Sequence, residues 1–128
     1  MVALTAAQIE ILNGKNFATV ATVMADGSPE ATLVWIETDG TYVYFNTAMH
    51  RLKARNLQRD PRVAIVVYDC AEPYSEVLAI KGRVELIFEG ADEHIDNLSR
   101  MYEDKPFAFR PGETRVMVRV TPERIHVQ

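Results

Sequence analysis

The sequence predicts a mainly β protein, a six-stranded antiparallel barrel with peripheral helices. Short runs rich in valine, isoleucine, threonine and aromatic residues recur along the chain, and such runs favour strands. Asp26-Gly27 and Asp39-Gly40 lie between successive runs, and an Asp-Gly pair is a strong signal for a two-residue hairpin turn. Closure into a barrel would remove exposed edges from strands this apolar. Periodicity alone is equally compatible with a sandwich.

The predicted strands place alternate side chains on opposite faces. In the second strand both faces are largely apolar, which predicts that both are covered. In the fifth, Gly82 lies within an apolar run and predicts a bulge or a close approach of another backbone. The six strands are expected at residues 17–24, 30–37, 41–46, 62–69, 76–88 and 114–120.

Three helices are predicted around these strands. Thr5 followed by Gln8 matches a capping box, so a short helix begins there. A basic helix follows the loop 46–50 and ends at Asp60-Pro61, because a residue that precedes proline avoids helical angles. The third helix, 91–103, has apolar residues at helical spacing and acidic residues on its other side.

Composition limits the classes of function. With 128 residues, of which 48% are hydrophobic and 25% charged, the chain is expected to form one domain, residues 1–128. It has neither an apolar run of ~20 residues nor a signal-peptide pattern, so we expect a cytoplasmic protein that binds no membrane. Cys70 is its single cysteine, which we interpret as a passive thiol in a reducing compartment. The net charge of −4 argues against nucleic-acid binding.

One segment, 42–68, is basic although the chain is acidic. Its local charge is +4, so the remainder of the chain carries −8. The cations begin where a helix is predicted to start, and helix N-termini offer free N–H groups and a partial positive charge. The segment is therefore a candidate phosphate site, with a solvated basic helix face as the alternative. Its five cations are Arg51, Lys53, Arg55, Arg59 and Arg62.

Helical geometry divides this basic cluster. Arg51, Arg55 and Arg59 recur every four residues and share one side, whereas Lys53 points almost oppositely in a regular helix. If the loop 46–50 wraps an anion at the helix start, Arg51 and Lys53 are the natural ligands. Arg55 and Arg59 are then expected to serve packing, salt bridges or a subunit contact.

No residue pattern identifies catalytic groups. His50, His94 and His126 lie far apart and lack partners at metal-ligand spacing, so no metal site is expected. A protein without a visible acid, base or nucleophile can rely on a cofactor for the difficult step. Trp35 lies next to the strand that ends near Thr47, and it is interpreted either as packing or as the border of a flat bound ring.

Three stretches of the sequence carry a family resemblance. They read ATVMADGSPEATLVWIETDGTYVYFNT at 21–47, HRLKARNLQRDPRVAIVV at 50–67 and KGRVELI at 81–87. With them the chain resembles the pyridoxamine 5'-phosphate oxidase-like flavin-binding split-barrel superfamily, and more narrowly its branch of deazaflavin-dependent oxidoreductases. The most specific part is the R-x-K-x-R-N-L-x-R-D-P-R run at 51–62. The implied fold is a six-stranded antiparallel split β-barrel.

This resemblance also implies the arrangement of a cofactor site. The protein would be a homodimer with two equivalent sites at the subunit interface, and a flavin-like ring would lie against the second and third strands. The phosphate would be held by Arg51 and Lys53, while the segment 74–77, which begins with Tyr74, and the loop 107–110 would be candidate contributions from the second subunit. The implied cofactor-binding residues are Thr32, Leu33, Val34, Trp35, Phe45, Asn46, Thr47, Arg51, Lys53 and Tyr74.

Two features depart from the pyridoxamine phosphate oxidases proper. Trp35 stands where a lysine would be expected, and the sequence ends at Gln128 without a longer segment that would grip a substrate phosphate. Both argue against oxidation of vitamin B6.

The expected function is therefore an oxidoreductase that uses the deazaflavin coenzyme F-420 to transfer hydride to an unsaturated small molecule, with no side chain assigned a catalytic role. FMN is the alternative cofactor. A non-catalytic flavin- or haem-binding protein and a dimeric domain without a ligand are the other interpretations.

Overall fold

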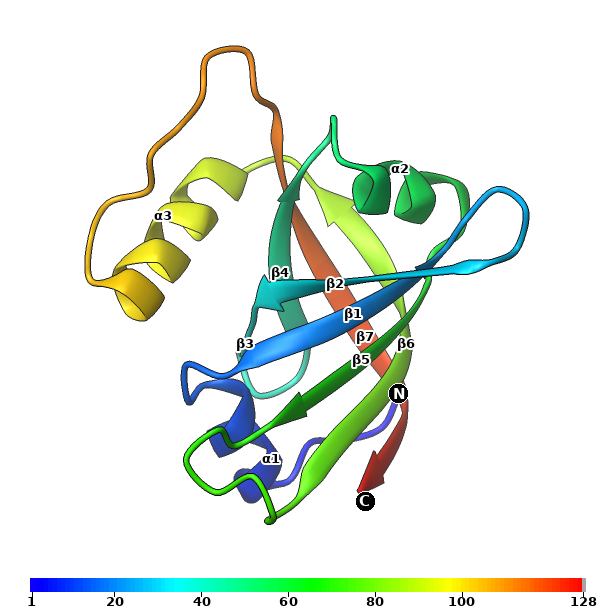
Figure 1. Ribbon diagram of the computed structural model, residues 1–128, viewed down its shortest axis with the longest axis vertical. Helices are drawn as coiled ribbons and strands as arrows, with labels where there is room; N and C mark the ends of the chain where they lie inside the picture. The colour runs from blue at the N-terminus through cyan, green and yellow to red at the C-terminus, as the bar shows by residue number, and fades with distance from the viewer. Residues whose placement is uncertain (128) are drawn as a thin grey trace.

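The computed structural model of the chain describes residues 1–127, whose strands form one strongly curled antiparallel sheet (Figure 1). The order of the strands across the sheet is β2-β1-β5-β6-β7-β4-β3. The strands are β1 (Phe17–Val23), β2 (Pro29–Trp35), β3 (Glu37–Thr38), β4 (Val43–Ala48), β5 (Arg62–Tyr68), β6 (Val77–Ile87) and β7 (Arg115–Val127).

The sheet curls until β2, at one end of the strand order, contacts β4 near the other end. Within residues 1–127 no backbone ladder joins these two strands, so the barrel is split along this line. The mainly β, antiparallel split-barrel prediction is confirmed. The inward faces of the strands form the core, whose largest fully buried side chains include Phe45, Ile65 and Ile80.

The structure has one more strand than predicted, because the expected strand 30–37 is interrupted at Ile36. The hydroxyl of Tyr102 accepts a hydrogen bond from the Ile36 N–H at 3.0 Å and lies 2.8 Å from its carbonyl oxygen. Both main-chain groups of Ile36 are therefore engaged outside the ladder. The two residues that follow, Glu37–Thr38, form β3 and pair with β4.

The helices are α1 (Ala6–Leu12), α2 (Leu52–Arg59) and α3 (Ala91–Glu103). The predicted capping box is present, since Thr5 and Gln8 exchange hydrogen bonds between side chain and backbone. Figure 1 shows α2 and α3 at one end of the barrel and α1 at the other. None of the helices formed by residues 1–127 is long and apolar enough to cross a membrane.

The bulge predicted at Gly82 is confirmed and explains why β7 is longer than expected. The register between β6 and β7 shifts between Lys81 and Gly82, and Gly82 lies opposite Pro122. A Cβ atom at Gly82 would collide with the carbonyl oxygen of Thr121. Proline is tolerated in a strand at such a bulge, so β7 continues through Pro122 where the sequence signal predicted its end.

Candidate functional site

A cavity of about 240 Å³ lies where α2 and α3 meet β2 and β4, beside the open line of the barrel. Its lining combines apolar and aromatic side chains with three cations, and within residues 1–127 it includes no aspartate, glutamate, histidine or cysteine. The lining residues are Phe17, Leu33, Val34, Trp35, Asn46, Thr47, Arg51, Lys53, Ile95, Leu98, Phe107 and Arg115.

Seven of the ten residues implied to bind a cofactor line this cavity. They are Leu33, Val34, Trp35, Asn46, Thr47, Arg51 and Lys53. The other three lie elsewhere. The Phe45 side chain is fully buried in the core and does not line the cavity. Thr32 is half-buried and its hydroxyl has no hydrogen-bond partner within residues 1–127. Tyr74 is fully exposed between β5 and β6.

Lys53 and Arg51 both reach the cavity because only one of them belongs to the helix. Arg51 is the N-cap residue of α2, with an extended backbone, so the helical spacing that would separate the two side chains does not apply to it. Lys53 lies on the buried face of α2, 9% exposed. No carboxylate within residues 1–127 makes an ion pair with either residue.

The electrostatics of Lys53 favour an added anion. Burial lowers the pKa of its ammonium group below the ordinary value, and the positive charges of Arg51 and Arg115 lower it further, against an opposing effect of Glu30. A buried ammonium group without an acidic partner is costly. An anion bound in the cavity would remove much of that cost.

Arg115 completes this group of cations, and no local sequence pattern identifies it. Its side chain is 9% exposed and extends from β7, where its Nε donates to Asn46 Oδ1 at 2.9 Å. Its Nη1 forms an ion pair with Glu113 at 3.0 Å, and its guanidinium lies 4.9 Å from the centre of the Phe107 ring. In the sequence Arg115 is one of the residues that alternate with valines along the last predicted strand. Its burial arises from α3 and from the segment that follows it, which no local signal reveals.

The remaining cations of the basic segment make contacts within the fold and do not line the cavity. Arg55 donates to the carbonyl oxygen of His50 at 3.3 Å, and Arg59 donates to that of Val23. Arg62 pairs with Asp60 at 2.7 Å and, mainly through its hydrogen bonds, lowers the pKa of that carboxyl to about 2. This agrees with the expectation that Arg55 and Arg59 serve packing rather than the anion.

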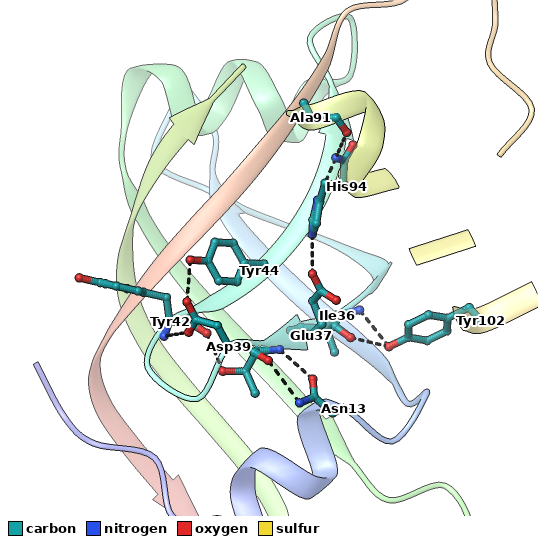
Figure 2. A network of polar contacts seen from close by, with 11 residues as sticks. Asn13, Ile36, Glu37, Asp39, Tyr42, Tyr44, Ala91, His94 and Tyr102 are labelled. Atoms are coloured by element: carbon teal, nitrogen blue, oxygen red, sulfur yellow. Dashed lines mark hydrogen bonds and ion pairs between the residues drawn. The ribbon is translucent and has the colours of Figure 1, made fainter. Parts of the chain in front are cut away.

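The aromatic wall of the cavity is fixed in place. The Trp35 ring stacks on Tyr102, with centroids 5.4 Å apart and an interplanar angle of 17°. Tyr102 is in turn anchored through its hydroxyl to the backbone of Ile36, as Figure 2 shows, and to the carbonyl oxygen of Asn16 at 2.8 Å. The only tryptophan of the chain therefore has a defined orientation beside the cavity.

A second hollow of about 260 Å³ adjoins the first, because Arg51, Phe107 and Arg115 line both. It continues under the segment after α3, where Lys105 and Arg110 add two further cations and Glu103 and Glu113 two acids. The loop 107–110 was expected to serve the partner's site, yet here Phe107 lines the cavity of its own chain.

The residues present fit a flavin-like cofactor. Three cations suit a phosphate group, and flat or apolar side chains suit a ring system. Without a carboxylate, imidazole or thiol in its lining, the cavity offers no strong general acid or base. It can therefore bind, orient and exclude water, while the cofactor would supply the reaction.

Comparisons with known proteins agree with this fold. The family model described as pyridoxamine 5'-phosphate oxidase matches residues 4–128. No curated protein matches the chain. Among solved structures, an F-420 reductase is similar to it with a TM-score of 0.84 and 28% identity, over 96% of this chain and 98% of that one.

Two further structures share the fold. A conserved hypothetical protein from Mycobacterium tuberculosis has a TM-score of 0.76 and 25% identity, over 98% of this chain and 85% of that one. A pyridoxamine 5'-phosphate oxidase-related, FMN-binding protein from Nostoc punctiforme has a TM-score of 0.71 and 17% identity, over 94% of this chain and 80% of that one. At this identity the likeness shows the fold alone. Since the family model spans nearly the whole sequence and the barrel agrees with it, the chain belongs to the pyridoxamine 5'-phosphate oxidase family, with its flavin-binding split-barrel fold.

Proposed function

We propose that this chain is an oxidoreductase that binds the deazaflavin coenzyme F-420 in the cavity and passes hydride to an unsaturated small molecule. The observation that carries the proposal is the convergence of Arg51, Lys53 and Arg115 on a cavity that has no acidic residue in its lining. The similarity to an F-420 reductase over nearly the whole chain supports the class of cofactor.

Different side chains of the cavity bind the phosphate, contact the ring and exclude water. Arg51 and Lys53 hold the phosphate at the start of α2, where free N–H groups add to the positive field. Trp35, fixed by Tyr102, provides a flat wall for the ring, and Ile95 and Leu98 exclude water from the other side. The reduced coenzyme, when bound, supplies the hydride. No lining group is suited to deliver the accompanying proton, so we assign it to solvent.

The second hollow favours the deazaflavin coenzyme over FMN. Both cofactors carry a tricyclic ring and a phosphate, but the deazaflavin coenzyme has a longer anionic tail. The hollow leads from Arg51 toward Lys105 and Arg110, which suits such a tail. A haem carrier gains no support, because His50 and His126 are exposed and neither lines the cavity.

A side-by-side titration with the deazaflavin coenzyme and FMN tests the cofactor. Trp35 lines the cavity and is the only tryptophan, so quenching of its fluorescence reports binding. We expect Lys53→Gln to weaken binding about thirtyfold, which corresponds to ~2 kcal/mol for removing one member of a buried charge pair. Arg55→Gln, on the exposed side of the same helix, is the matched control and should leave affinity unchanged.

Several outcomes of this titration would count against the proposal. Failure of both cofactors to bind at micromolar protein would overturn it, and so would equal affinities of the Lys53→Gln and Arg55→Gln variants. Binding of FMN alone would establish the alternative cofactor. Hydride transfer is then checked by the loss of reduced-coenzyme absorbance in the presence of activated alkenes.

We also infer that the working unit is a homodimer, with each cavity at the subunit interface. Phe17 and Leu33 line the cavity and are also exposed at its mouth. A second copy that covers them would close the cavity. Tyr74, which projects into solvent in one chain, would then be available to the partner's site.

A further inference from the structure

Asn46 links the cavity to a buried histidine on α3. Its amide Nδ2 donates to the carbonyl oxygen of Ala91 at 2.9 Å and lies 3.1 Å from His94 Nδ1. Its Oδ1 accepts from Arg115 Nε at 2.9 Å. On the far side of the imidazole, His94 Nε2 lies 2.9 Å from Glu37 Oε1, and Figure 2 shows this histidine between Ala91 and Glu37.

These partners determine which way the Asn46 amide points. A backbone carbonyl only accepts hydrogen bonds and an arginine Nε only donates them. The Asn46 nitrogen must therefore face Ala91, and its oxygen must face Arg115. Reversing the amide would place two acceptors together on one side and two donors together on the other.

The amide orientation in turn determines the tautomer of His94. The Asn46 nitrogen has no lone pair to accept a hydrogen bond, so His94 Nδ1 must be the unprotonated acceptor. The ring proton then resides on Nε2, where it is donated to Glu37. His94 is 8% exposed, so water offers little competition for either ring nitrogen. Such second groups commonly fix which nitrogen of a histidine carries the proton.

The chain of contacts ends at a cation that lines the cavity. Arg115 uses Nε for Asn46 and Nη1 for Glu113, while its Nη2 makes no hydrogen bond within residues 1–127. Two fixed donors leave the planar guanidinium little freedom to rotate. If the Asn46 oxygen turned away, the Nε contact would be lost and the guanidinium would keep only its Nη1 contact to Glu113.

We propose that His94 is a positioning residue: held by Glu37 as the neutral Nε2–H tautomer, it accepts the second N–H of the Asn46 amide and, together with the Ala91 carbonyl, keeps the Asn46 oxygen on Arg115, which directs that guanidinium into the cavity. The part of this inference that concerns affinity rests on the proposed cofactor site. The part that concerns the tautomer and Arg115 does not depend on any ligand.

Nitrogen-15 NMR of the protein without added ligand tests the tautomer directly. The two ring nitrogens of His94, assigned with a His94→Asn variant, should appear as a protonated Nε2 and an unprotonated Nδ1 at neutral pH. A ring protonated at Nδ1, at both nitrogens or in a mixture of the two neutral forms would overturn the proposal.

A pair of substitutions separates positioning from packing. Asparagine places a side-chain oxygen near the position of Nδ1, so His94→Asn keeps an acceptor for Asn46. Glutamine reaches the position of Nε2, so His94→Gln keeps a partner for Glu37 but removes that acceptor. Both variants lose the ring, and a purely packing role would affect both in the same way.

The readouts are the Arg115 Nε–H signal and the affinity for the coenzyme. In the wild type and in His94→Asn, this N–H should exchange slowly with water, whereas His94→Gln should speed its exchange at least tenfold. The dissociation constant of the deazaflavin coenzyme should rise about tenfold in His94→Gln, the effect expected for one lost buried hydrogen bond, and less than threefold in His94→Asn.

Equal behaviour of the two folded variants, checked by thermal unfolding, would overturn the proposal. If no cofactor binds, the proposed function fails and the exchange rates still decide this inference.

Discussion

At the scale of single residues, Lys53 opposes folding and favours binding. Its ammonium group is buried beside two guanidinium groups, and within residues 1–127 it has no ion-pair partner. Replacing a buried charge by an apolar side chain of similar volume is often neutral or stabilising. A residue that opposes folding in this way is typical of a binding site, where the ligand provides the missing interaction.

Lys53→Met should therefore stabilise the protein in the absence of ligand and weaken anion binding. We expect the free energy of unfolding at neutral pH to rise by about 1 kcal/mol, measured by urea denaturation. Because the pKa of Lys53 is lowered in the folded state, the cost of its charge is fully present below that pKa. It disappears as the pH rises from there to the ordinary lysine value, so the advantage of the variant should shrink in alkaline solution. A variant less stable than the wild type at neutral pH would contradict this account.

The three cations that line the cavity differ in how far the sequence could reveal them. Arg51 and Lys53 were predicted because they lie at a helix start in an acidic chain, which is a local signal. Arg115 belongs to the same cavity but reaches it from β7. Only the pairing of β7 with β4, which sets Arg115 opposite Ala48, brings it there. Phe45 was implied only by the family resemblance, and its side chain is buried in the core rather than in the lining of the cavity.

At the scale of elements, the junction between β2 and β3 shapes the cavity wall. Tyr102, on α3, engages the main chain of Ile36 between the two strands and also carries the stacked Trp35. The Tyr102 side chain thus connects α3 to the backbone between β2 and β3. Burial raises the pKa of its hydroxyl, so the group remains protonated and able to donate under ordinary conditions.

Tyr102→Phe should destabilise this junction while it preserves the stacked ring. The substitution leaves the fully buried Ile36 with main-chain groups that lack their partner, which costs about 1–3 kcal/mol. Thermal unfolding measures the loss. Phe17→Leu, which removes the edge contact to Tyr102 but leaves its hydroxyl in place, is the control and should cost less. If the two variants were equally stable, the hydroxyl would have no structural role.

The elements themselves were predictable wherever their signals are local. The two hairpins, the capping box of α1 and the bounds of α3 follow from a few neighbouring residues. The Asp-Gly pairs do mark the turns, but both turns are longer than the predicted two residues, since residues 24–28 connect β1 to β2 and residues 39–42 connect β3 to β4. The interruption at Ile36 and the continuation of β7 through Pro122 depend instead on Tyr102 and Gly82, which are distant in sequence. Such contacts become visible only once the strands are paired.

At the scale of the whole molecule, the outer face of the sheet bears exposed apolar side chains. Leu33 is 66% exposed and Val66 42%, and both lie opposite Thr19 in the register of β2, β1 and β5. Residues directly opposite one another share a face, so these side chains form one row across three strands. Leu33 also lines the cavity. An apolar face that continues into a binding site is typical of an interface.

Val66→Glu should therefore separate the proposed dimer and weaken cofactor binding at the same time. A carboxylate in the centre of this face would be buried without a partner when two copies meet, and such a charge opposes association. Sedimentation velocity should give twice the chain mass for the wild type at micromolar concentration and one chain mass for the variant. Phe88→Glu, at a comparably exposed apolar position beyond the end of β6, is the control and should remain dimeric.

Fluorescence titration of the same samples should show that the monomeric variant loses affinity for the coenzyme, because each cavity lacks the partner that closes it. A wild-type monomer that binds coenzyme with full affinity would exclude a shared site.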